Sequence, residues 1–335
     1  MSMKSASKQK LRLLYIIDIL SKKSDEEHPL SAFDIIDYLN NDYGIACERK
    51  TVYDSIDCLI EYGYDIIKSK SPRGYFMASN RFEIPELRLM IDAVQAADFI
   101  SAKKTKMLLE KFSAFASEYN YKRILKQVYI DNRNKCANEN IFYIIDELNN
   151  AVVKKLQVEV VYRRRKVTDG GKAVFEEKSM TVNPYALLWS NDHYYLVGNY
   201  SKYDNLIHLR IDRLKSVTVT DVPARHFSEV SPYRTSFDVA DYAKKHLSMF
   251  SGDIKPVELI CNNEIIEEFI DKFGEKCYMR PCDDNTFLAK VDTAVTDGLV
   301  SWIMQYGKNV KVKAPKELKN MIIDKTNSIL DLYNR

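Results

Sequence analysis

The side chains best suited to chemistry lie in residues 183–213, a segment patterned as short β-strands. Because side chains alternate between the two faces of a strand, Leu196 and Leu209 turn to one face and leave polar neighbours on the other. Two guanidinium groups and a phenol on one open surface suit a phosphate or another anion, because arginine donates hydrogen bonds in a fixed fork. The residues predicted to line this anion site are Tyr195, His208, Arg210 and Arg213.

Two features of this region have alternative interpretations. Arg210 or Arg213 could instead pair with Asp212 and only stabilise the sheet. The dense basic run Arg163-Arg164-Arg165-Lys166 fits a solvated hairpin end as well as a nucleic-acid contact, because alternation points only about half of it to one surface. We include Arg163 among the predicted ligand-binding residues.

A second set of candidate side chains lies on a helix predicted at about 48–62. Its buried face is set by Val52, Ile56 and Leu59, so the polar residues near its N-terminal end point to solvent. Recognition helices commonly contact bases with that end, where arginine reads guanine while lysine, threonine and tyrosine mostly contact phosphate. The predicted DNA-binding residues are Arg49, Lys50, Thr51, Tyr53, Lys68, Lys70 and Arg73.

The elements around that helix are typical of a winged helix-turn-helix. A Ser-x-x-Asp pattern at Ser31 predicts the start of a helix, and Gly44 suits the tight turn that follows it. The alternative is a small helical bundle with a solvated polar face. The predicted elements are helices at 8–21, 31–43 and 48–62 and strands at 66–70 and 75–78, with a turn at 71–74.

Helical periodicity returns from Ile84, with Pro85 at a favourable first-turn position and an Asn-rich loop at 131–140. We expect this region to be a connector that also holds two subunits together. The predicted helices are 85–99, 103–118, 120–130 and 140–156.

From Val158 the hydrophobic period changes to two, and Asp169-Gly170-Gly171 predicts a hairpin turn. Five short strands within about sixty residues indicate a small Sm/SH3-like barrel or a strongly bent sheet. Residues 256–335 alternate strand, helix, strand, strand, helix, strand and helix, the order of a ferredoxin-like α+β domain, with Trp302 in its core. The later strands of the small sheet are predicted at 173–183, 185–190, 193–200 and 206–211.

The composition is that of a globular protein of several domains, with 335 residues, 46% of them hydrophobic and 29% charged. Without an apolar run that could span a membrane, and without a secretory signal, we expect a cytoplasmic protein. The six cysteines form no CxxC pair and are expected to be reduced and structural. The net charge is +3, and residues 1–80 hold 11 basic and 12 acidic residues, so cations that contact DNA must be placed locally.

The sequence contains no motif for catalysis, for a cofactor or for a metal. Its ten glycines form neither GxGxxG nor GxxxxGKS/T, HExxH is absent, and the five histidines are scattered without a carboxylate partner nearby in the sequence. We therefore expect a binding protein rather than an enzyme, with no cofactor, no metal site and no contact with a membrane.

Taken together, these runs resemble bacterial WYL-domain transcriptional regulators over nearly the whole chain. The likeness is carried by Arg49-Lys50-Thr51-Val52-Tyr53, by Gly74-Tyr75-Phe76 and by Glu86-Leu87 through Asp92-Ala93-Val94-Gln95. The WYL trio itself falls on Tyr194-Tyr195-Leu196, with Tyr194 in the place of the family's tryptophan.

The resemblance implies a multidomain α+β protein that binds double-stranded DNA as a homodimer and senses a nucleotide or a single-stranded nucleic acid in its WYL domain. Ligand binding would set the spacing of the two recognition helices. An alternative is an accessory protein, beside a CRISPR effector or elsewhere, that binds RNA or single-stranded DNA through the WYL barrel. The implied domains are a winged helix-turn-helix at 1–80, a connector at 81–156, a WYL domain at 157–230 and a C-terminal extension at 231–335.

Overall fold

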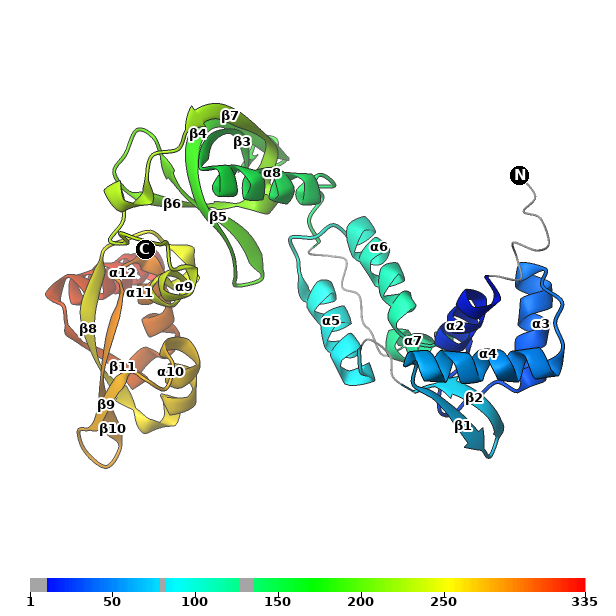
Figure 1. The fold of residues 1–335 in the computed structure, drawn as a ribbon. Coiled ribbons are helices and arrows are strands. Elements are labelled where there is room, and N and C mark those ends of the chain that lie inside the picture. Colours follow the sequence, from blue (N-terminus) through cyan, green and yellow to red (C-terminus); the bar gives the residue numbers. More distant parts are fainter. Residues whose placement is uncertain (1–10, 79–81, 127–134, 335) are drawn as a thin grey trace. The chain divides into compact units, whose positions relative to one another are not determined.

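The protein is described by a computed structural model that covers residues 11–78, 82–126 and 135–334 (Figure 1). The chain divides into two compact units, Met1–Glu139 and Asn140–Arg335, which are described separately. The helix predicted at 140–156 therefore belongs to the second unit, while the other connector helices belong to the first. No helix in the described ranges combines the length and the apolar character that a membrane span requires.

Three helices and a two-stranded hairpin open the first unit, in the predicted order. The predicted boundaries are present: the Ser31 side chain and Asp34 form a reciprocal capping box, and Gly44 ends its helix with positive φ. Gly63 ends the next helix in the same way. The buried face of this part includes Ile16, Ile35 and Val52. The elements are α2 (Arg12–Lys23), α3 (Ala32–Tyr43), α4 (Arg49–Tyr62), β1 (Ile66–Lys70) and β2 (Arg73–Met77).

The rest of the first unit is helical. Leu87, Ile91 and Leu109 form its small core. Its last described helix is tied to the first part by the Ser117 hydroxyl, which donates to the buried Asp25 carboxylate at 2.5 Å. The elements are α5 (Ile84–Ala96), α6 (Ala102–Phe112), a 3-10 turn at Ser113–Phe115 and α7 (Glu118–Lys126), while the end of the helix predicted at 120–130 and most of the loop predicted at 131–140 lie outside the described residues.

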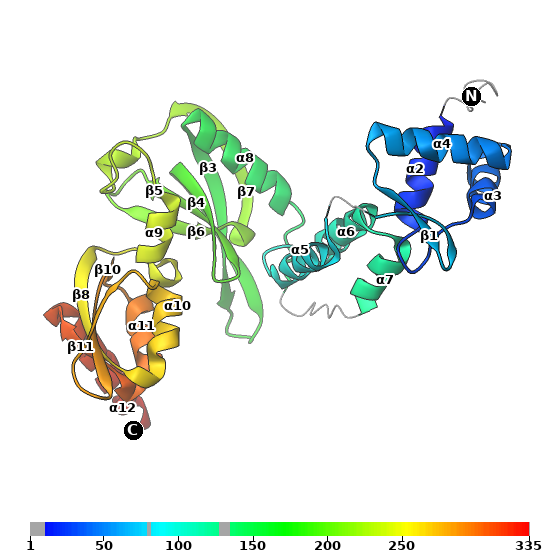
Figure 2. The ribbon, with the colours of Figure 1, turned by 60° about the horizontal axis from the view of Figure 1, so that its bottom comes forward.

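The second unit begins with a helix that packs into a strongly bent, antiparallel five-stranded sheet (Figure 2). The strand order is β6-β5-β4-β3-β7, and among the described strands the edges β6 and β7 do not pair with each other. The bent sheet is therefore present, whereas a closed barrel is not confirmed. The elements are α8 (Ile141–Lys154), β3 (Leu156–Val167), β4 (Ala173–Ser190), β5 (His193–Tyr200), β6 (Leu206–Arg210) and β7 (Leu214–Pro223).

The strands of this sheet differ from the prediction in two ways. The strands predicted at 173–183 and 185–190 are one continuous strand, because Pro184 sits at a register shift against β5 and the ladder resumes at Ala186. The fifth strand is instead β7, which pairs with β3 and was not predicted. The predicted turn after β3 is confirmed: Thr168 and Lys172 are hydrogen-bonded across it, and Gly171 has φ 74°.

A connecting segment covers one face of this sheet before the last domain begins. We call residues 226–253 the strap; it contains 3-10 turns at Phe227–Glu229 and Leu247–Met249 and the helix α9 (Val239–Lys245). Tyr242, which is 1% exposed, packs with Val197 of β5 and Leu206 of β6 in the cluster that the strap and the sheet share. The strap thus decides how much of this face is open.

The last domain has the predicted β-α-β-β-α-β order followed by a helix, and its sheet has the order β11-β8-β10-β9. Trp302 is 8% exposed and packs edge-on against Phe273, which confirms its predicted place in the core. The elements are β8 (Ile254–Asn262), α10 (Ile266–Phe273), β9 (Tyr278–Pro281), β10 (Thr286–Ala294), α11 (Asp297–Gln305), β11 (Val310–Ala314) and α12 (Lys316–Tyr333).

Candidate nucleic-acid and ligand interfaces

The N-terminal end of α4 carries an arginine held by aromatic rings. The guanidinium of Arg49 lies 5.2 Å from the ring centroid of Phe33 and 5.3 Å from that of Tyr53, and its Nε donates to the Tyr53 hydroxyl at 2.6 Å. Cation–π contacts of this kind fix a side chain in space while leaving its charge uncompensated. Arg49 is therefore positioned and exposed at the end of the helix where the sequence predicted a base contact.

The hairpin of β1 and β2 is joined to this cluster through Tyr75. The rings of Tyr53 and Tyr75 are 6.1 Å apart, and Nζ of Lys68 lies 5.8 Å from the Tyr75 centroid. A short β-bridge between Leu30 and Tyr75 fixes the hairpin against the segment before α3. Gly74 allows this approach, because a Cβ there would lie 2.8 Å from the Leu30 backbone.

The remaining predicted DNA-binding residues lie on α4 and on the hairpin. Lys50, Lys70 and Arg73 are exposed, and Lys70 stands opposite Arg73 in the hairpin register. Thr51 is half-buried in the first turn of α4. Phe33 was missed by the sequence reasoning, and its signal was an aromatic residue at a solvent-facing helical position, where it is 61% exposed.

In the second unit, the predicted anion-binding residues share one face of the sheet, as alternation required. Tyr195 is directly opposite Arg210 in the ladder between β5 and β6, and His208 is opposite Val197. Arg213 is exposed in the 3-10 turn that follows β6. Arg163 lies further along β3, where its Nε donates to Glu177 at 3.0 Å.

The guanidinium of Arg210 is already hydrogen-bonded to the carboxylate of Asp212. Its Nε and one terminal nitrogen donate to the two oxygens of Asp212 at 3.0 and 2.7 Å, and the Arg210 side chain is only 23% exposed. This bidentate pair raises the pKa of Arg210 further above its usual value. In this structure Arg210 therefore pairs with Asp212, as the alternative interpretation of the sequence proposed.

His208 is held between the sheet and the strap. Its Nε2 is 2.7 Å from the Tyr242 hydroxyl, and the Ser251 hydroxyl is 3.1 Å from its Nδ1. Burial, followed by the nearby His246, lowers the pKa of His208 from 6.5 to about 4. At neutral pH the imidazole is uncharged and both of its nitrogens are engaged within the protein.

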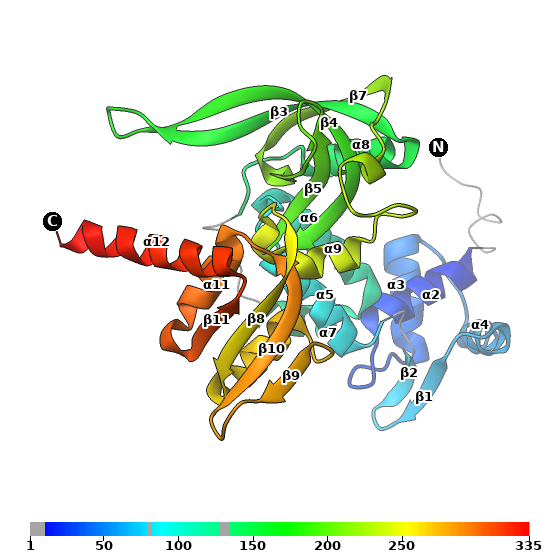
Figure 3. The same ribbon diagram turned by 90° about the vertical axis from the view of Figure 1, so that its left-hand side faces the viewer.

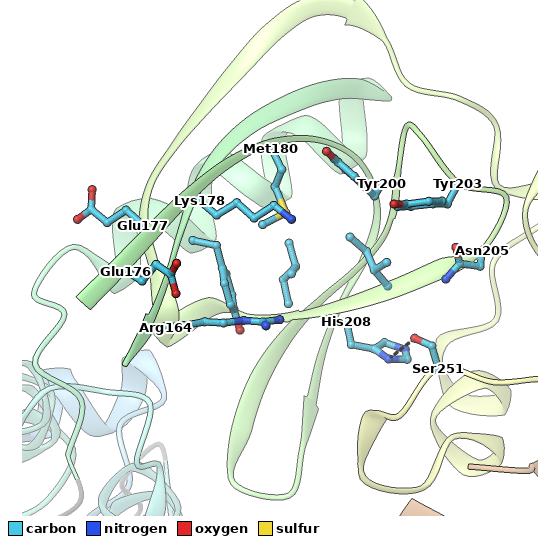
Figure 4. A pocket seen from close by; sticks show the side chains of 13 residues that line it. Arg164, Glu176, Glu177, Lys178, Met180, Tyr200, Tyr203, Asn205, His208 and Ser251 are labelled. Carbon is cyan, nitrogen blue, oxygen red and sulfur yellow. Dashed lines mark hydrogen bonds between the residues drawn. The ribbon is translucent and has the colours of Figure 1, made fainter. Parts of the chain in front are cut away.

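A hollow of about 640 Å³ lies beside the junction of His208 and Ser251, which both line it (Figure 4). Its lining includes the apolar side chains Met180 and Leu209 and the tilted ring pair Tyr200 and Tyr203, whose centroids are 5.6 Å apart. Nζ of Lys178 lies 5.9 Å from the Tyr200 ring centroid. The lining of this hollow mixes aromatic, apolar and charged side chains, and it includes His208 from the predicted ligand-binding set.

The possible metal ligands are dispersed over residues 11–78, 82–126 and 135–334. Within those ranges, no three His, Cys, Asp or Glu side chains gather in a group that could hold a metal ion. Among the cysteines, Cys261 is buried, whereas Cys58 and Cys282 are exposed.

Comparison with known proteins places this sheet and the last domain in named families. The family profile of the WYL domain matches residues 143–219, and that of the WCX domain matches residues 257–330. This chain contains a WYL domain and a WCX domain. The WYL match runs from α8 into β7, and the WCX match runs from β8 into α12. The resemblance to proteins with a WYL domain followed by a C-terminal extension is confirmed over these two segments.

Other comparisons add little detail. No curated protein matches the sequence. Among solved structures, proteasome accessory factor B/C (PafBC) of Arthrobacter aurescens is similar over 97% of this chain, with 14% identity and a TM-score of 0.28. The chain spans about half of that protein, 49% of its length.

Proposed function

We propose that this WYL-domain protein is a transcription regulator that binds double-stranded DNA through its first unit and acts without catalysing a reaction. In this proposal α2 to β2 form a winged helix-turn-helix, with α4 as the recognition helix and the hairpin as the wing. The observation that carries it is Arg49, held over Phe33 and Tyr53 at the exposed N-terminal end of α4. Lys50, Lys70 and Arg73 supply further cations for phosphate.

The regulatory part of the proposal is an anionic ligand on the strap-covered face of the WYL domain. Its proposed contacts are Arg213, which is exposed, and the opposed pair Tyr195 and Arg210. Asp212 must be displaced before a phosphate can take the fork of Arg210, so the ligand would break one internal contact to form another. The full proposed set is Tyr195, His208, Arg210, Arg213 and Arg163.

The strap gives this ligand a route to act on the rest of the second unit. His208 joins β6 to Tyr242 and Ser251 of the strap, so a ligand that shifts Arg210 two residues away also disturbs that junction. A switch requires a difference in affinity of about 1–3 kcal/mol between the two arrangements of the protein. We further propose that the regulator works as a cytoplasmic homodimer, with the helices after β2 as its connector.

The test is selection of duplexes from fragmented genomic DNA by the full-length protein, followed by fluorescence anisotropy on a selected duplex. Arg49→Ala together with Lys50→Ala is expected to weaken binding at least tenfold, because one positioned base contact and one phosphate contact are lost. A matched variant, Lys103→Ala together with Lys106→Ala on α6, removes two exposed lysines of the same unit and should bind as the unmodified protein does. Equal affinities for all three proteins would refute the assignment of α4.

Comparing duplex with single strands of the same sequence, at a stated salt concentration, separates this function from the accessory role through the WYL domain. Preference for the single strand, with no effect of the α4 substitutions, would favour that second function.

A further inference from the structure

The hairpin of β3 and β4 extends beyond the sheet as a two-stranded ribbon (Figure 3). We call residues 162–178 the basic arm; the ladder pairs Tyr162 with Lys178 at its base and Val167 with Ala173 near its tip. From Arg164 to Ser179 every residue is exposed. The arm therefore stands in solvent over most of its length.

The arm concentrates the positive charge of the chain. It has six basic and three acidic residues, so its net charge of +3 equals that of the entire 335-residue chain. Arg163 is paired with Glu177, which also accepts from Lys215 at 2.8 Å. Among the described residues, no ion pair engages Arg164, Arg165, Lys166 or Lys172.

The free cations point to both faces of the ribbon. Alternation along β3 puts Arg165 on one face and Arg164 and Lys166 on the other. On the first face Phe175 is directly opposite Arg165, and its ring lies 5.4 Å from the guanidinium of Arg163 and 5.5 Å from that of Arg165. The exposed ring thereby orients two guanidinium groups instead of offering an open platform for a base.

We infer that the basic arm is a second nucleic-acid contact of this protein, which binds the phosphate backbone of double-stranded DNA. The major groove admits a two-stranded β-ribbon and has a phosphate backbone on each side. A ribbon with uncompensated cations on both faces matches that geometry. Proteins that bind single strands without sequence preference rely on aromatic stacking, and Phe175 already packs against arginines.

The experiment measures the affinity of the full-length protein for a 40-base-pair duplex of arbitrary sequence across a salt series. The arm variant is Arg165→Ala, Lys166→Ala and Lys172→Ala. Each lost phosphate contact lowers the slope of log affinity against log salt by about 0.9, so the expected decrease is roughly 2.7, with affinity at least about tenfold weaker at 0.1 M salt. Retention of the melting temperature shows that the variant is folded.

The matched control removes the same charge from another surface of the second unit. Lys276→Ala, Lys308→Ala and Lys316→Ala replace three exposed lysines of the C-terminal domain. This control is expected to keep the slope of the unmodified protein. An arm variant with an unchanged slope, or a control that lowers it equally, overturns the inference, because the effect would then be absent or due to net charge alone. A larger loss on a single strand of the same length than on the duplex also overturns it.

The inference is independent of the proposed role of α4, and the two can fail separately. Combining the arm variant with Arg49→Ala and Lys50→Ala should lower the slope further than either alone. If the arm variant changes the slope and the α4 variant does not, the inference about the arm is supported and the assignment of α4 as the recognition helix is refuted. If only the α4 variant changes it, the reverse holds.

Discussion

Two binding surfaces of this protein were predicted from arginines and tyrosines, and in the structure these side chains have different contacts on the two surfaces. On α4, the Arg49 guanidinium lies over two aromatic rings and keeps its charge available to solvent. On the WYL sheet, Arg210 is clamped by Asp212, and His208 is uncharged and bonded to the strap. The comparison shows that the same residue types make an open contact surface or an internal junction, according to what packs on them.

The strongest way to break the internal junction is to remove Tyr242, which packs against both the sheet and the strap. Tyr242→Ala deletes a buried aromatic side chain and should lower the free energy of unfolding by about 3–5 kcal/mol. Tyr242→Phe loses only the hydrogen bond to His208 and should cost about 1 kcal/mol. Urea denaturation followed by tryptophan fluorescence measures both, and similar small losses would mean that the strap is not anchored there.

The open surface should respond in affinity rather than in stability. Arg49→Ala is expected to weaken binding of a selected duplex by about 1–3 kcal/mol, or roughly 5- to 150-fold, with little change in the melting temperature, because the side chain is exposed. Arg49→Lys keeps the charge and loses the planar fork, so it should recover only part of the affinity. Full recovery with lysine would show that Arg49 contacts only phosphate.

Removing the partner of Arg210 should make the WYL sheet an open contact surface, as α4 already is. Asp212→Asn removes the internal carboxylate and should strengthen binding of inorganic pyrophosphate by about tenfold, since hydrogen bonds to charged groups contribute about 1.5–3 kcal/mol. Isothermal titration calorimetry gives the affinity, and Asp221→Asn, an exposed residue of β7, is the control. Unchanged binding in the Asp212 variant would exclude Arg210 from the ligand site.

The smallest expected effect is the pH dependence of the junction. The pKa of His208 falls from 6.5 to about 4 on folding. Between these two pH values the unfolded chain is therefore protonated at this residue while the folded chain is not. Stability should therefore be constant above pH 6.5 and decrease as the pH falls toward 4, by about 1 kcal/mol between pH 6.5 and 5.5. His246, whose pKa is also lowered, adds in the same direction. His208→Gln should flatten the profile; an unaltered profile would assign the titration elsewhere.

Local features were predictable from sequence in both regions. The capping box at Ser31 and the left-handed glycines Gly44 and Gly63 depend on neighbours within one turn, so their residues alone indicate where helices begin and end. Alternation also predicted that Tyr195, His208 and Arg210 share a face, because period two is a property of every strand. The β-α-β-β-α-β order of the last domain followed from the same periodicities.

What failed to follow from the sequence depends on contacts between distant segments. Pro184 marked a strand end in the pattern, yet the ladder with β5 carries the strand past it through a register shift. The basic run at 163–166 has two interpretations in the sequence alone, and only the pairing of β3 with β4 shows that its cations lie on both faces of one ribbon.

The sequence by itself determined which elements form and which side chains share a face, because helix caps and strand alternation are decided by neighbouring residues. Only the tertiary structure decided which of those faces stays open. The strap that buries His208 begins eighteen residues further along the chain, at His226, and the ring that holds Arg49 comes from α3. Burial and charge compensation arise from segments that meet only after folding, and these set whether an arginine contacts a ligand or its own protein.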